Sequence, residues 1–148
     1  MNRPNFMDLA LQEAKLAAER GEVPVGAVVV SGDRVVAQAG NETRARRDPT
    51  AHAEMLAIRR AARALDAERL LGCDLYVTLE PCAMCAGAIS FARIRRLYFA
   101  AGDEKGGAVE NGPRFFSQTT CHHAPDIYSG LAEREAAALL VRFFAERR

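Results

Sequence analysis

Residues 74–85 decide the fold class, and they read DLYVTLEPCAMC. The first part, residues 74–79, is rich in Val, Thr, Tyr and Leu and is typical of a short strand. Pro81 follows almost directly, and proline is favoured at the first position of a helix. We therefore expect a helix that begins at Pro81 and continues to about Phe91, so that a strand passes straight into a helix.

The same succession of strands and helices extends on both sides of this stretch. Residues 48–50 combine capping residues with a proline, and we expect a helix from there to about Leu65 that buries Met55, Ile58, Ala62 and Leu65. The other expected elements are a helix over residues 6–20, a hairpin of strands 25–30 and 34–39, a polar loop over 40–47, a strand over 94–100, a long irregular segment over 103–124, a short strand over 126–129 and a closing helix over 131–147.

This order of elements predicts an α/β fold, with one sheet covered by helices on both faces. The chain has 148 residues and shows no internal repeat, low-complexity tract or linker, so we expect a single domain over residues 1–148. Its longest apolar run is far shorter than a membrane span, and residues 1–5 lack the pattern of a signal peptide. We expect a soluble, cytoplasmic protein. The net charge of +1 neither supports nor excludes a nucleic-acid partner.

Cys82 and Cys85 are three residues apart, so on a helix their side chains share one face. A helix N-terminus lowers the pKa of a thiol, and the thiolate is the form that binds zinc. His52, near the start of the preceding helix, can supply a neutral imidazole. Three protein ligands leave one tetrahedral position open, as in catalytic zinc sites. The sequence therefore predicts one catalytic Zn²⁺ held by His52, Cys82 and Cys85.

Glu54 is the predicted catalytic acid and base. Side chains of a first helical turn tilt toward the N-terminus, so the Glu54 carboxylate can reach a water in the open position beside His52. Zinc lowers the pKa of such a water to about 7, and a carboxylate within reach can move its proton to the substrate. The structural alternative, a capping box, requires Ser or Thr three residues earlier, and position 51 is alanine.

Two other interpretations of the cysteines stay open at this point. Cys82 and Cys85 could form a redox pair, although the thioredoxin-like context, a Cys-x-x-Cys after a first strand near the N-terminus, is missing. Residues 121–123 (Cys-His-His) could supply a fourth zinc ligand. A saturated zinc would be structural and not catalytic.

His52-x-Glu54 together with Pro81-Cys82-x-x-Cys85 is the signature of the zinc-dependent nucleobase deaminases. Longer segments resemble one branch of that superfamily, the bacterial tRNA adenosine deaminases. These segments are residues 22–28 (EVPVGAV), 48–54 (DPTAHAE), 76–82 (YVTLEPC), 85–89 (CAGAI) and the Phe-Phe pair at 143–144. The resemblance covers nearly the whole chain.

The resemblance implies a three-layer α/β/α, cytidine-deaminase-like fold with a central five-stranded mixed sheet, one Zn²⁺ per subunit and a homodimer. It implies that adenosine at the wobble position of a tRNA anticodon stem-loop is flipped into the zinc pocket and converted to inosine. Asn41 matches a family position that contacts the nucleoside, and Asp103 and Lys105 match a loop beside the anticodon nucleotides. Residues 121–123 fall in a surface loop of the family.

Two further functions are weighed against this one. A deaminase of a free base or nucleoside, such as cytosine or guanine, would share the zinc site and differ only in the walls of the pocket. A non-catalytic, zinc-stabilised RNA-binding subunit would be expected to lack the glutamate, and Glu54 is present.

Overall fold

The structure is a computed structural model and describes residues 5–147. Residues 1–4, which belong to the stretch tested for a signal peptide, and Arg148 lie outside the described residues. The elements are α1 (Phe6–Glu19), β1 (Gly26–Ser31), β2 (Arg34–Gly40), α2 (Ala53–Leu65), β3 (Cys73–Leu79), α3 (Ala83–Ala92), β4 (Arg96–Ala101), the 3-10 turn η1 (Phe115–Ser117), β5 (Asp126–Ser129) and α4 (Glu133–Ala145).

The five strands form one mixed sheet in the order β2-β1-β3-β4-β5. Strand β1 is antiparallel to both β2 and β3, whereas β3, β4 and β5 are parallel. Strands β2, β3, β4 and β5 therefore all point the same way, and their carboxyl ends meet at one edge of the sheet. The expected five-stranded mixed sheet and the expected order of elements are confirmed.

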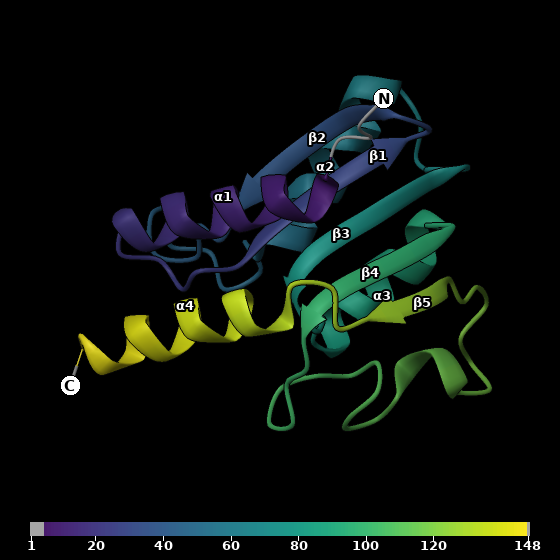
Figure 1. Ribbon diagram of the computed structural model, residues 1–148. Coiled ribbons are helices and arrows are strands. Elements are labelled where there is room, and N and C mark those ends of the chain that lie inside the picture. The colour runs from purple at the N-terminus through teal and green to yellow at the C-terminus, as the bar shows by residue number, and fades with distance from the viewer. Residues whose placement is uncertain (1–4, 148) are drawn as a thin grey trace.

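The helices cover both faces of the sheet, as Figure 1 shows, with α1 and α4 on one face and α2 and α3 on the other. Alternate residues of β1, β3 and β4 pack into two separate hydrophobic cores, one on each face of the sheet. In β1, for example, Ala27 and Val29 pack under α2 and α3, while Val28 and Val30 pack under α1. This alternation buries both faces and accounts for the nearly continuous apolar run of β1. The three-layer α/β/α arrangement is thereby confirmed.

Helix α2 begins later than the sequence predicts, at Ala53 and not at residues 48–50. The side chain of Asp48 accepts hydrogen bonds from the backbone N–H (2.8 Å) and the hydroxyl (2.7 Å) of Thr50. These bonds form a turn ahead of the helix, a common use of Asp before Pro. The capping position falls to His52, whose side chain makes no capping hydrogen bond. Likewise α3 begins at Ala83, with Cys82 at its cap, and not at Pro81.

The buried stripe of α2 was also predicted wrongly. The stripe consists of Ala53, Leu56, Ala57 and Ala61, together with Glu54, whereas the expected Met55, Ile58 and Ala62 are half-buried and Leu65 is exposed. The alanines at 53, 57 and 61 share one row of the helix. Their small side chains let the helix backbone approach the sheet, and the larger apolar residues flank the contact.

Helix α1 lies directly on the backbone of the hairpin at two glycines. A Cβ atom at Gly26 would overlap the carbonyl oxygen of Ala10, and one at Gly40 would lie 2.8 Å from the carbonyl oxygen of Glu13. Only glycine permits this approach. Among the described residues, no helix is both long and apolar enough to traverse a lipid bilayer.

We expect Gly26→Ala to lower the free energy of unfolding by about 3 kcal/mol, because the added methyl group must push α1 off the sheet. Urea unfolding followed by circular dichroism measures the change. Gly102→Ala is the matched control, since a Cβ there meets its nearest neighbour at an ordinary 3.7 Å. Equal stability of the two variants would show that the α1–β1 contact is not close packed.

Candidate active site

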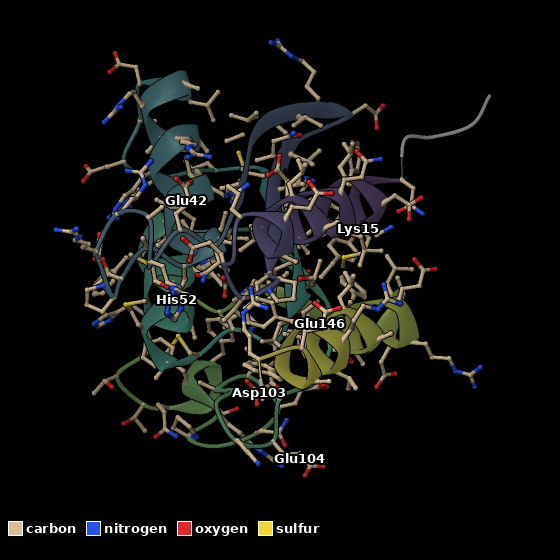
Figure 2. The ribbon with its side chains drawn as sticks, turned by 90° about the vertical axis from the view of Figure 1, so that its left-hand side faces the viewer. Lys15, Glu42, His52, Asp103, Glu104 and Glu146 are labelled. Carbon is tan, nitrogen blue, oxygen red and sulfur yellow. The ribbon has the colours of Figure 1, made fainter. Side chains whose placement is uncertain are left out.

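The candidate site lies at the edge where the strands end. Helices α2 and α3 both begin at this edge, since each follows a strand that points toward it. His52 caps α2, and Cys82 caps α3. Figure 2 looks onto this edge, with His52 from the start of α2 and Asp103 from the loop after β4 both labelled. Crevices at the carboxyl ends of strands are the usual binding sites of open α/β sheets.

His52, Cys82 and Cys85 come together there as the sequence predicts. Nδ1 of His52 lies 3.6 Å from Sγ of Cys82 and 3.5 Å from Sγ of Cys85. A tetrahedral zinc with one N and two S ligands places such N and S atoms about 3.6 Å apart. The three potential ligand atoms all lie within 4.8 Å of one another, so this group can hold a metal ion.

The electrostatics of the group favour a thiolate at Cys82. A hydrogen bond with Cys85 is the main cause that lowers the pKa of Cys82 to about 4. The same contact and burial raise the pKa of Cys85, so the two sulfurs share a proton. The hydrogen bond with Cys82 raises the pKa of His52. A divalent cation would displace these shared protons, because zinc binds thiolate and neutral imidazole.

Glu54 lies in the first turn of α2, only 4% exposed. Burial is the main cause that raises the pKa of its carboxyl group. The side chain lines the same cavity as His52 and Cys82. Because Glu54 stands two residues after the cap and position 51 is alanine, it does not form a capping box. A buried carboxyl beside candidate metal ligands is typical of a catalytic acid or base.

The cavity in front of this group measures about 340 Å³, within the range of small-molecule sites. Its walls are partly apolar, from Val23, Val25 and Leu79. Polar side chains converge on it from separate loops. They are Asn41, Thr43, His52, Glu54, Glu80, Cys82 and Asp103. An apolar slot with a few convergent polar groups suits a flat heteroaromatic ring.

Asn41 follows the end of β2 and is buried at the cavity, as its predicted role requires. Its Nδ2 donates a weak hydrogen bond of 3.4 Å to Oγ1 of Thr43. The loop that carries both residues is held from beneath by Glu22, which is buried. The Glu22 carboxylate accepts backbone hydrogen bonds from Arg44 (3.0 Å) and Ala45 (2.8 Å). The sequence-based predictions did not include this function of Glu22; the available signal is a carboxylate directly before the apolar run of residues 23–30.

Asp103 and Lys105 lie in the loop after β4, but they are placed differently. Asp103 lines the cavity beside His52, although its Oδ1 accepts hydrogen bonds from the backbone of Lys105 and Gly106. Lys105 does not line that cavity. It lines an adjoining one of about 530 Å³, together with Leu140 and Phe144 of α4. The predicted pair is therefore split between the cavity and its approach.

Cys121 lies on a different part of the molecule from the candidate ligands. Its Sγ contacts Oγ of Ser90 at 3.6 Å and donates to the carbonyl oxygen of His123 at 3.1 Å. Nε2 of His123 lies 2.7 Å from the carbonyl oxygen of Ile94. Within residues 5–147, the metal-binding group comprises His52, Cys82 and Cys85 without Cys121. The arrangement leaves a tetrahedral position for water.

Comparison with known proteins agrees with this geometry. The MafB19-like deaminase profile matches residues 1–142. The tRNA-specific adenosine deaminase of Agrobacterium fabrum is 66% identical over 146 residues, which are 99% of this chain and 96% of that protein. A solved structure from work on A-to-I editing by tRNA:A34 deaminases at the wobble position of transfer RNA superposes with a TM-score of 0.90 at 68% identity. It covers 91% of this chain and 98% of that one.

More distant structures, among them guanine deaminases, share the fold. The guanine deaminase of Bacillus subtilis is 34% identical, with a TM-score of 0.68, and covers 99% of this chain and 94% of that one. The expected cytidine-deaminase-like fold is confirmed. By the extent and identity of these matches, the chain belongs to the tRNA-specific adenosine deaminases, within the MafB19-like deaminase family.

Proposed function

We propose that this protein hydrolyses adenosine to inosine and ammonia at the wobble position of a tRNA anticodon. The observation that carries the proposal is the buried Glu54 carboxyl, which faces the same cavity as His52 and Cys82. The 66% identity to a tRNA-specific adenosine deaminase supports RNA as the substrate. The reaction replaces the exocyclic amino group at C6 with oxygen from water.

His52, Cys82 and Cys85 would hold one Zn²⁺, which fits their spacing and the lowered pKa of Cys82. When bound, the ion would supply Lewis-acid activation of water at neutral pH. Cys82 caps α3, and Cys85 lies in the first turn of this helix, where it is fully buried. The chain thus fixes the position of the water relative to Glu54.

Glu54 moves the protons of the reaction. Its carboxylate takes a proton from the attacking water and delivers it to N1 of the adenine ring. It then takes the second proton and gives it to the leaving amino group at C6. Burial raises the pKa of the Glu54 carboxyl above its ordinary value, which makes its carboxylate a stronger proton acceptor. Water adds and ammonia leaves, so the overall reaction balances.

The remaining walls position the base. Val23, Val25 and Leu79 flank the ring, and Asn41 offers an amide to the nucleoside. A base that is flipped out of an RNA loop can enter such a slot. Asp103 and Lys105, at the cavity and its approach, would lie along the neighbouring nucleotides.

Our proposal includes a cytoplasmic homodimer with no membrane attachment. The family resemblance supports the dimer, and so do two exposed apolar side chains, Leu71 (72% exposed) and Phe91 (76% exposed). The segments that carry them are joined, because the N–H of Leu70 donates a 2.7 Å hydrogen bond to the carbonyl oxygen of Ala92. Exposed apolar neighbours of this kind are typical of protein interfaces.

Inosine formation tests the function. The zinc-loaded protein is incubated with an anticodon stem-loop carrying adenosine at the wobble position. A stem-loop with guanosine there and free adenosine, cytosine and guanine serve as controls. We expect inosine from the first RNA alone. Turnover of a free base with an untouched stem-loop would assign the protein to small-molecule deamination instead.

Glu54→Gln keeps the size of the side chain but removes its ability to accept a proton. We expect kcat to fall by roughly 10²–10⁴-fold while the zinc content stays near one per chain. Steady-state kinetics and elemental analysis measure the two quantities. Glu68→Gln, at an exposed glutamate, is the control. Loss of zinc in the Glu54 variant would mean that this residue is a ligand and not a proton carrier.

Cys82→Ala should lose bound zinc, because it removes one of three ligands. Cys121→Ala should retain zinc, since Cys121 contacts Ser90 and not the metal-binding group. Elemental analysis of both purified variants gives the answer. Zinc retained in the first variant and lost in the second would reverse the assignment and favour a closed, structural site.

A further inference from the structure

Glu80 is a buried carboxylate to which the chemistry described above gives no role. It directly follows β3, two residues before Cys82, and is only 2% exposed. Its two oxygens accept five hydrogen bonds from the loop after β4. The donors are the backbone N–H groups of Asp103 (2.9 Å), Val109 (3.0 Å), Glu110 (2.9 Å) and Asn111 (3.1 Å), and Nδ2 of Asn111 (2.7 Å).

Over residues 5–147, no lysine or arginine forms an ion pair with Glu80. The negative charge is therefore compensated by peptide dipoles and one amide. Such an arrangement of backbone N–H groups forms an anion-binding nest, and here the anion is a side chain of the protein itself. A buried carboxylate without these donors would carry a large desolvation cost. The loop conformation and the charge of Glu80 consequently depend on each other.

The loop is shaped to enclose this one side chain. A Cβ atom at Gly107 would lie 2.5 Å from the carboxyl carbon of Glu80. The N–H of Gly107 donates to the carbonyl oxygen of Asp103 at 2.9 Å, and the N–H of Ala108 donates to that of Pro81 at 2.9 Å. Residues 103–111 thus wrap around Glu80 and Pro81, with glycine at the point of closest approach.

The same loop forms one wall of the active-site cavity. Asp103 and Gly106 line it together with His52 and Glu54. Lys105 reaches the adjoining cavity from this loop. Glu80 also lines the active-site cavity, and its carboxylate joins this wall to the residues that lead into α3.

We propose that Glu80 is a positioning residue for substrate binding, whose carboxylate holds residues 103–111 as the wall of the cavity. This inference rests on the proposed function for the identity of the substrate. Glu80 touches no reacting atom; it acts through Asp103, Gly106 and Lys105. It sets how tightly the RNA is held, while Glu54 and the metal ligands set the chemical step.

Glu80→Gln tests the proposal, because it keeps the shape but turns one acceptor oxygen into an NH₂ group that faces N–H donors. Amide hydrogen exchange is measured on the zinc-loaded protein. We expect faster exchange confined to residues 103–111, with one zinc per chain retained. With the stem-loop RNA, we expect KM to rise about tenfold while kcat changes less than about threefold, the pattern of lost uniform binding.

Asp74→Asn is the matched control. Asp74 is another buried carboxylate at the opposite end of β3, where it pairs with Arg95 at 3.1 Å, far from the cavity wall. It should lower stability while leaving the exchange of residues 103–111 and KM unchanged. Asn111→Ala removes one of the five donors and should shift exchange and KM in the same direction as Glu80→Gln, by less.

Two results would overturn the proposal. One is unchanged exchange in residues 103–111 of Glu80→Gln. The other is a mobile loop with unchanged KM, which would make Glu80 structural only. A failure of the proposed function is distinguishable, because the wild-type protein would then make no inosine from the stem-loop. The exchange experiment and the KM for whichever base is turned over would still test Glu80.

Discussion

The rest of this molecule depends on one constraint, which is that helices α2 and α3 both begin at the same edge of the sheet. Because β1 is antiparallel to both its neighbours, β2 and β3 run in the same direction and end at the same edge of the sheet, one on each side of β1. The helices that follow them begin there, and their caps are His52 and Cys82. A metal-binding group then forms from residues 30 positions apart in sequence. The loops after β2 and β4 open at the same edge and complete the cavity.

Three buried glutamates surround this site, and the free-energy cost of burying their carboxylates is met in two ways. Glu22 and Glu80 accept backbone hydrogen bonds from the loops on the two sides of the cavity, so their charges order peptide that would otherwise be free to move. Glu54 lacks such a nest, and burial raises the pKa of its carboxyl. The two anchored carboxylates keep the walls in place, and the unanchored one is left able to exchange protons.

The residues proposed for catalysis and those proposed for RNA binding therefore lie on different parts of the fold. The candidate ligands lie at caps and first turns, where packing against the sheet limits their movement. The groups that would meet RNA lie on loops, which is where binding residues are generally found. Lys105, on the approach to the cavity, depends for its position on a loop that encloses Glu80.

The sequence by itself determined the chemistry and the order of elements. Spacing on a helix places Cys82 and Cys85 on one face, and the spacing of His52 and Glu54 is equally local; together the two pairs form a recognisable signature. Local sequence also predicted every strand. Sequence reasoning failed at the start of α2, where the Asp48 side chain closes a local turn that competes with the helix. It also failed where residues distant in sequence decide the outcome, as when contact with the sheet selects the alanine row of that helix. Only the tertiary structure decided whether Cys121 joins the metal-binding group, which cavity Lys105 lines, and which groups surround Glu22 and Glu80. Each depends on a loop folding back across the sheet edge, and no periodicity in the sequence encodes that contact.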